Sequence, residues 1–306
     1  MRELEAVNAI CYSGYREGQR PGAIPPSFEQ TKEDLLILEK NWKLLRLYDC
    51  GPHAETVLEV IRQEKLDLQV MLGAFIGAEV NNPSCPWGGI YPDADLSRNR
   101  RDNRVQIEKL IELANRYPDL ISSVSAGNEA TVEWTDHLVP VASVVEYVRM
   151  LKRGVQQPVT FCENYLPWQG KLEALVAEVD FISLHTYPIW EFKSIAQALS
   201  YTQENYRSVS ARYPGAPVVI TEAGWATASN GRGIPPGNAG EELQHAYYQD
   251  LTRWSREQGI LTFVFEAFDE PWKGSADPAD PEKHWGLFTA GRKPKRVMRG
   301  LYPELR

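Results

Sequence analysis

The sequence predicts a single (β/α)8 barrel, the TIM-barrel class of α/β fold, and two features of the chain carry that prediction. Short apolar or β-branched runs alternate with longer amphipathic stretches along the 306 residues. Runs that are apolar on consecutive positions are typical of parallel strands buried on both faces. Eight strand–helix units in about 300 residues match the size of such a barrel. The alternative, an open doubly wound sheet, favours a Gly-rich phosphate turn, and neither GxGxxG nor GxxxxGKS/T occurs.

Eight segments are predicted to form the strands. In chain order they are Val7–Ser13, Leu44–Asp49, Leu68–Phe75, Ile121–Glu129, Pro158–Asn164, Phe181–Pro188, Pro217–Gly224 and Leu261–Glu270. Helices are predicted at Phe28–Trp42, Ala54–Glu64, Arg98–Tyr117, Val141–Arg153, Leu172–Glu178, Ser194–Arg212 and Gly240–Gln258. In the first helix, for example, Leu35, Leu38 and Trp42 share one apolar stripe. No linker divides the chain, so we expect one domain over residues 1–306.

Composition and charge exclude several classes of function. With 33 basic and 41 acidic residues the net charge is 33 − 41 = −8, which argues against a nucleic-acid or anionic-membrane surface. No apolar run approaches the ~20 residues of a membrane helix, so we expect no membrane insertion. The start, MRELEAVNAICYS, lacks the basic and apolar regions of a secretory signal.

The longest predicted loops follow strands rather than helices. They are Ile76–Ser97, Ala226–Ala239 and Pro271–Trp285, all rich in Pro and Gly. Loops of this kind lie at the C-terminal face of a barrel, where barrel enzymes have their active sites. We therefore expect the functional site at that face.

Seven of the nine tryptophans are predicted at or after the C-terminal ends of strands. They are Trp87, Trp134, Trp168, Trp190, Trp225, Trp272 and Trp285. A single tryptophan there would more often be core, but seven on one face would leave a wide apolar surface unless something covers it. Flat rings with polar edges suit sugars. We expect at least two of Trp87, Trp134, Trp168, Trp225 and Trp272 to line an open cleft.

Two glutamates stand at the C-terminal ends of nearly uncharged strands. Glu129 ends the run AGNE and Glu222 lies in TEAGW. A carboxylate there is costly unless it is paired or belongs to a site, and a structural ion pair is the alternative. Two carboxylates facing one cleft are typical of glycosidic bond cleavage, with one as general acid and the other as nucleophile or base.

Other chemistries find little support. The four cysteines form no CxxC pair, and no HExxH motif or GxSxG elbow occurs. Of the five histidines, only His185 is predicted at a strand end. We therefore expect no metal ion and no cofactor.

Six motifs, in barrel order, resemble glycoside hydrolase family 17. They are NAICYS, LLRLYD, SAGNEA, HTYP, ITEAGW and FEAFDEPWK, and the resemblance extends from about Val7 to Phe288. That family contains 1,3-β-glucan hydrolases and glucanosyltransferases, and the last motif is closer to its fungal and bacterial members. The resemblance implies a retaining mechanism, with the acid/base on strand 4 and the nucleophile on strand 7.

Carried over residue by residue, the resemblance implies that Glu129 is the acid/base and Glu222 the nucleophile. Asn128 would bind the sugar 2-hydroxyl, and Tyr187 would hold the nucleophile. The other substrate-binding residues on the matching motifs are Tyr12, Tyr48, Asp49, Trp225, Glu266, Glu270, Trp272 and Lys273. Among them, Glu270 and Lys273 would form a charged pair at the cleft edge. Glu266 stands where plant members have an apolar residue. As alternatives, Asp49 and Glu270 would cap loops and Tyr12 would belong to the core. Trp134 and Trp168, in the loops after the fourth and fifth strands, are added as binding residues because their aromatic rings suit acceptor sugars.

The resemblance implies β-1,3-glucan as the binding partner and leaves two reactions open. In a hydrolase, water attacks the glycosyl-enzyme; in a glucanosyltransferase, a second glucan chain does. A non-catalytic glucan-binding barrel would predict loss of one carboxylate, and both are present. We expect hydrolysis, a monomer, and action in the periplasm or outside the cell, because polymeric glucan does not cross inner membranes.

Overall fold

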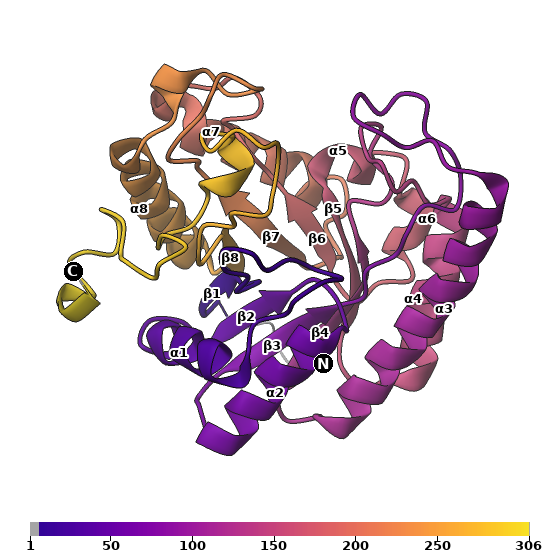
Figure 1. Ribbon diagram of the computed structural model, residues 1–306. Helices are drawn as coiled ribbons and strands as arrows, with labels where there is room; N and C mark the ends of the chain where they lie inside the picture. Colours follow the sequence, from indigo (N-terminus) through magenta and orange to yellow (C-terminus); the bar gives the residue numbers. More distant parts are fainter. Residues whose placement is uncertain (1–5, 306) are drawn as a thin grey trace.

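The computed structural model describes residues 6–305 and forms a closed barrel of eight parallel strands paired in chain order (Figure 1). Strand β1 pairs with both β2 and β8, which closes the ring. The strands are β1 Asn8–Cys11, β2 Leu44–Leu47, β3 Gln69–Gly73, β4 Ile121–Asn128, β5 Val159–Asn164, β6 Ile182–His185, β7 Val218–Gly224 and β8 Thr262–Phe265. The predicted TIM barrel and its eight strands are confirmed. Residues 1–5 and 306 of the predicted domain lie outside the described residues.

A layer of helices surrounds the barrel (Figure 1). They are α1 Phe28–Glu39, α2 Pro52–Glu64, α3 Asp93–Arg116, α4 Val141–Gly154, α5 Tyr165–Trp168, α6 Glu173–Val176, α7 Ile195–Ser210 and α8 Glu241–Gln258. Short 3-10 turns occur at Pro236–Asn238, Pro281–Lys283 and Pro303–Leu305. All seven predicted helices are present, whereas the single turn α5 was not predicted. None of the helices in residues 6–305 is long and apolar enough to span a membrane.

Local sequence explains where α1 starts and ends. Ser27 and Gln30 form a capping box: the Ser27 side chain accepts from the Gln30 N–H, and the Gln30 side chain accepts from the Ser27 N–H. Leu35 and Leu38 face the core as predicted, but the helix ends at Glu39. Trp42, predicted to lie on this helix, follows it and is buried all the same.

The eighth unit differs from the prediction, because no α-helix follows β8 among the described residues. Pro294, Pro303 and two nearby glycines disfavour a helix there. The segment instead packs through aromatic rings: the Phe288 ring lies 5.0 Å from that of Tyr302 and 6.4 Å from that of Trp42. The Tyr302 hydroxyl donates to the Ile37 carbonyl of α1 at 2.9 Å. An irregular segment therefore covers the side of the barrel that the predicted eighth helix would cover.

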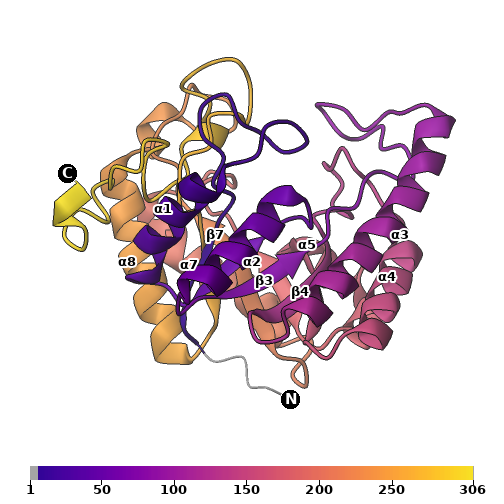
Figure 2. The same cartoon turned by 60° about the horizontal axis from the view of Figure 1, so that its bottom comes forward.

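The long loops lie at one end of the barrel, as the loop lengths predicted. Figure 2 shows the segments after β1, β3 and β8 rising on the same side of the barrel. The loops after β3 and β4 are tied together, since the Asn82 amide donates to the Glu133 and Thr135 carbonyls at 2.8 and 2.7 Å. These loops form the walls of the site.

Candidate active site

A cleft of about 1750 Å³ opens at the C-terminal ends of the strands. Glu129 and Glu222 both line it, together with residues from the loops after β1, β3 and β8. This is the end at which barrel enzymes bind their substrates. The structure thus brings the two predicted carboxylates into one cavity.

Glu222 is held in a fixed orientation at the bottom of the cleft. It lies in β7 and is only 5% exposed. One carboxylate oxygen, Oε1, accepts from Arg46 Nη1 at 2.5 Å and from the Tyr48 hydroxyl at 3.0 Å. The other, Oε2, accepts from the Tyr187 hydroxyl at 2.5 Å. These three donor–acceptor contacts to an ionised carboxylate are charge-assisted and leave it little freedom.

Arg46 joins the two halves of the site. It lies in β2, is 2% exposed, and its guanidinium stacks 4.4 Å from the centre of the Tyr48 ring. While Nη1 binds Glu222, Nη2 donates to the Asn128 side-chain oxygen. A planar guanidinium with several donors suits this bridging role better than an ammonium group would.

Glu129 directly follows β4, and the backbone aims its side chain into the cleft. The pairing of β4 with β5 shifts register between Ser125 and Asn128. Gly127 adopts a φ of 133°, and an added Cβ there would lie 2.6 Å from Ile76. Glu129 itself has a φ of 45°, a left-handed conformation uncommon outside glycine. Its N–H donates to the Cys162 carbonyl of β5 at 2.9 Å.

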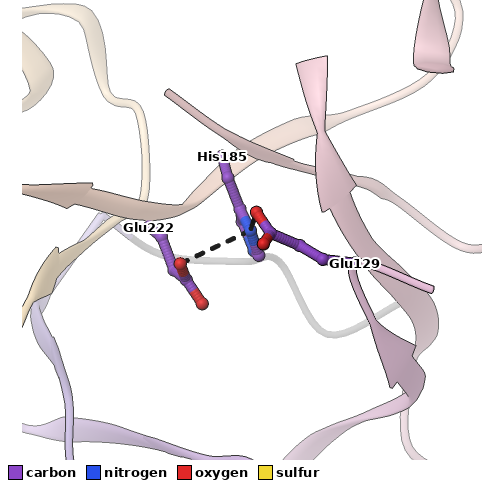
Figure 3. A group of neighbouring side chains, drawn as sticks. All are labelled: Glu129, His185 and Glu222. Atoms are coloured by element: carbon purple, nitrogen blue, oxygen red, sulfur yellow. Dashed lines mark hydrogen bonds and ion pairs between the residues drawn. The ribbon is translucent and has the colours of Figure 1, made fainter. Parts of the chain in front are cut away.

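His185, the last residue of β6, lies between the two glutamates (Figure 3). Its Nδ1 is 2.8 Å from Glu129 Oε1 and 3.5 Å from Glu222 Oε2. One side-chain oxygen of each glutamate and a ring nitrogen of His185 all lie within 4.8 Å of one another. The three side chains therefore form one electrostatically coupled group.

The charges in this group stabilise one another. Burial alone would raise the pKa of Glu222, but the positive charges of His185 and Arg46 and the Tyr187 hydrogen bond lower it to about 2. Burial alone would lower the pKa of His185, but the Glu222 carboxylate and the contacts with Cys162 and Glu129 raise it to about 10. Near neutral pH, Glu222 is therefore ionised and His185 is protonated.

The same three side chains are of types that can ligate a divalent metal. Metal binding requires a neutral imidazole, whereas His185 carries a proton on the nitrogen that faces Glu129. Arg46 already supplies the positive charge beside Glu222. The donor set therefore fits proton transfer better than metal ligation.

Several predicted polar residues lie at the cleft, but not all of them point into it. Glu270 and Lys273 form the expected ion pair, and the Trp272 indole N–H donates to Glu270 at 3.0 Å. Asp49 lines the cleft and also accepts from the Gly51 N–H at 2.7 Å, at the start of α2. The contacts of Asp49 are thus partly structural.

Tyr12 lines the cleft, as expected of a binding residue, and its hydroxyl also donates to the buried Asp34 at 3.0 Å. The structure corrects one predicted charged binding residue, Glu266. Glu266 is buried away from the cleft lining, 3.5 Å from Lys273 Nζ. Burial and the neighbouring Glu270 charge raise the pKa of Glu266 well above its usual range, against the opposing charge of Lys273.

The tryptophans divide into cleft and core. Trp87, Trp134 and Trp272 line the cleft, so the prediction that at least two of the five would do so is confirmed. Trp168 and Trp225 are wrong as binding residues, because both are fully buried. Their indole N–H groups donate to the Ser183 and Asn238 carbonyls, each at 2.9 Å. A buried indole needs such a partner, and backbone carbonyls between the strands and loops provide it.

Sequence reasoning missed three residues of the site. Arg46 and His185 contact the glutamates directly. His137 lies in the loop after β4, where its Nε2 donates to the Asn128 carbonyl at 2.9 Å. A charged residue inside an apolar strand, as in LLRL, was the signal that could have identified Arg46.

Comparisons with known proteins agree with this geometry. A family model described as the BtgE/BtgC glycoside hydrolase domain matches residues 9–286. The probable glucan endo-1,3-beta-glucosidase btgC of Aspergillus clavatus is 25% identical over 296 residues, which cover 89% of this chain and 39% of that protein. The glucan 1,3-beta-glucosidase of Arthroderma benhamiae is 33% identical over 219 residues, 68% of this chain and 69% of that protein. The chain thus spans about two fifths of the length of the Aspergillus relative.

Solved structures share the fold. An endo-laminarinase from Formosa Hel1_33_131 superimposes with a TM-score of 0.84 at 28% identity, covering 97% of this chain and 86% of that one. A mutant β-1,3-glucanosyltransferase of Rhizomucor miehei, bound to laminaritriose, gives 0.75 at 21% identity, covering 95% of this chain and 96% of that one. The second likeness shows the fold alone.

The coupling between Glu222 and His185 can be tested by titration. In Glu222→Gln, loss of the carboxylate charge should lower the pKa of His185 from about 10 toward its ordinary value of 6.5. NMR of the labelled imidazole would measure this shift. His137, whose ring nitrogen lies 2.7 Å from Asp136, should titrate as in the wild type and serves as the internal control. An unchanged His185 titration would contradict the proposed coupling.

Proposed function

The chain belongs to the BtgE/BtgC glycoside hydrolase domain family, and from that premise we propose that it cleaves β-1,3-glucan by a retaining mechanism. The observation that carries the proposal is the short separation of its two carboxylates, whose nearest oxygens lie within 4.8 Å. Carboxyl groups in retaining glycosidases stand about 5–5.5 Å apart, whereas inverting enzymes need roughly 6.5–9.5 Å to admit a water molecule. The separation supports direct attack by a carboxylate on the sugar.

In the first step, Glu222 is the nucleophile. Its pKa of about 2 keeps it ionised, and Arg46 and Tyr187 hold it in place. A carboxylate oxygen forms a bond to the anomeric carbon while the glycosidic C–O bond breaks. The electron pair of that bond goes to the leaving oxygen, which takes a proton from Glu129.

In the second step, Glu129 acts as a base. It removes a proton from an incoming water molecule, whose oxygen attacks the anomeric carbon and releases Glu222. Two inversions at the same carbon give net retention. Glu129 suits this double role because its side chain is 28% exposed in the cleft, where it can exchange protons with substrate and solvent.

The substrate class rests on the relatives and on the cleft. The Aspergillus relative is named as a probable glucan endo-1,3-beta-glucosidase, the Arthroderma relative as a glucan 1,3-beta-glucosidase, and the Formosa structure is an endo-laminarinase. The cleft, of about 1750 Å³, is lined by several aromatic rings, which suit an oligosaccharide chain. The six motifs support the finer proposal of glycoside hydrolase family 17, of the bacterial or fungal-like type. We retain a single catalytic domain over residues 1–306 and a monomer as further proposals.

Transfer to a second glucan is the other candidate reaction, and one observation favours it. Phe75 and Trp87 are 51% and 58% exposed and both line the cleft. The Phe75 ring lies 5.4 Å from that of His137, which in turn binds the Asn128 carbonyl next to Glu129. Aromatic rings on the Glu129 side lie where a leaving or an accepting chain would bind. Glucanosyl transfer would use the same two glutamates.

Variants of the two glutamates separate their roles. Glu222→Ala should abolish turnover of every substrate, because no glycosyl-enzyme can form, and azide should restore cleavage with inverted configuration. Glu129→Ala should retain activity on aryl glycosides whose leaving group needs no proton.

A reducing-end assay on laminarin first establishes turnover by the wild type. Absence of turnover would instead favour a non-catalytic glucan-binding barrel, and an α-anomer as the first product in NMR would exclude retention.

The aromatic rings on the Glu129 side should hold part of the substrate. Trp87→Ala should weaken binding of a long laminari-oligosaccharide by roughly 1–3 kcal/mol, measured by calorimetry on an inactive Glu222→Ala background. In Trp87→Ala with Glu222 intact, products longer than the substrate should also become rarer if the enzyme transfers glucan.

Phe192→Ala is the matched control, because Phe192 is 70% exposed and does not line the cleft. Equal binding by Trp87→Ala and the control would show that the loop after β3 does not contact the glucan.

A further inference from the structure

Glu163 is a buried carboxylate that the mechanism above does not use. It lies in β5 and is fully shielded from solvent. Its Oε2 accepts from the Thr131 N–H at 2.9 Å and from the Thr131 hydroxyl at 2.6 Å, and its Oε1 accepts from the Asn164 N–H at 2.7 Å. All three partners donate. An acceptor-only arrangement of this kind suits an ionised carboxylate.

The partner of Glu163 lies in the turn that carries Glu129. Thr131 is two residues beyond Glu129, whose φ of 45° is unfavourable for a residue with a side chain. Strand β5 holds this turn at two points: Cys162 accepts from the Glu129 N–H at 2.9 Å, and Glu163 binds Thr131. Lys171 also donates to the Thr131 carbonyl. The contacts on both sides of Glu129 maintain its unusual backbone conformation.

Glu163 lies behind the barrel wall rather than in the cleft. Side chains alternate along a strand, and Cys162 faces the interior close to Arg46 and His185, so Glu163 faces outward. Glu129, which follows β4, is the charged group that acts on Glu163, and Lys171 from the turn before α6 donates to the carbonyl of its partner Thr131. The covering helix α4 turns its charged residues Glu146, Arg149, Lys152 and Arg153 to solvent.

Burial and the nearby charge of Glu129 raise the pKa of Glu163 to about 7, against the hydrogen bonds from Thr131 and Asn164. Glu163 and Glu129 thus repel each other when both are ionised.

We propose that Glu163 is a positioning residue for Glu129: its carboxylate binds Thr131 and so fixes the turn that carries the acid/base. The proposal rests on the proposed retaining function and adds a third carboxylate to it. Glu163 touches no substrate. It acts through Thr131.

Glu163→Gln tests the proposal, because the amide keeps the shape but loses the charge and one acceptor. For a laminari-oligosaccharide, kcat/KM should fall about tenfold, part of the roughly 10²–10⁴-fold that general acid–base catalysis supplies. For a dinitrophenyl β-laminaribioside, whose leaving group needs no proton, kcat/KM should stay near the wild-type value. The ratio of the two kcat/KM values should therefore fall about tenfold, a selective loss that a general loss of stability would not produce.

Two further variants make the result specific. Thr131→Val, which loses the hydroxyl donor to Glu163, should lower the ratio of kcat/KM for the two substrates in the same direction but less. Thr131→Ser, which keeps the hydroxyl, should show the wild-type ratio. Glu79→Gln is the matched control: Glu79 is equally buried but bonds to Asn103, Ser143 and Tyr147 of α3 and α4. It should lower the melting temperature without changing the ratio of kcat/KM for the two substrates.

The proposal is overturned if Glu163→Gln and Thr131→Val keep the wild-type ratio of kcat/KM for the two substrates, or if Glu79→Gln changes that ratio equally. If Glu163→Gln does not fold, the two threonine variants decide by the same readouts. Failure of the proposed function is distinguishable, because a wild-type protein that cleaves neither substrate would refute that function before any variant is compared.

Discussion

The buried ion pair between Arg46 and Glu222 is the interaction on which the rest of the site depends. It crosses the barrel from β2 to β7, and both side chains are almost fully buried. Removing one partner of such a pair leaves an uncompensated charge and costs about 3–5 kcal/mol. The same guanidinium reaches Asn128, the residue before Glu129. One buried cation thus orients a residue on each of the two strands that carry the glutamates.

The two glutamates differ because their surroundings differ. Glu222 is buried among cations and hydroxyl groups, which keep it ionised. Glu129 projects from an irregular strand end into the cleft, and β5 holds its backbone. Pairs of carboxylates placed in unlike environments are how one site performs both nucleophilic and acid chemistry. His185 lies between them and contacts both, so a change of charge on one glutamate alters the electrostatic environment of the other.

Sequence patterns predicted the barrel because each strand is an apolar run and each helix has a buried stripe. They also predicted that Glu129 and Glu222 would face one cleft, as they do, since a carboxylate at the end of an apolar strand is conspicuous. They failed where the position of a residue in the chain does not determine which way its side chain points. Trp168 and Trp225 follow strand ends but turn into the core, where backbone carbonyls satisfy their indole N–H groups. Arg46 was missed because its partner lies 176 residues away in the chain.

Trapping the covalent intermediate tests the central claim most directly. A 2-deoxy-2-fluoro laminaribiosyl fluoride forms the glycosyl-enzyme but slows its breakdown, because fluorine destabilises the positively charged transition state. The account predicts one added fluoroglycosyl group per chain in the intact mass, on a peptide that contains Glu222, and no addition to Glu222→Ala. A label on any other residue, or rapid cleavage of the wild-type substrate with inverted configuration and no labelled enzyme, would contradict it.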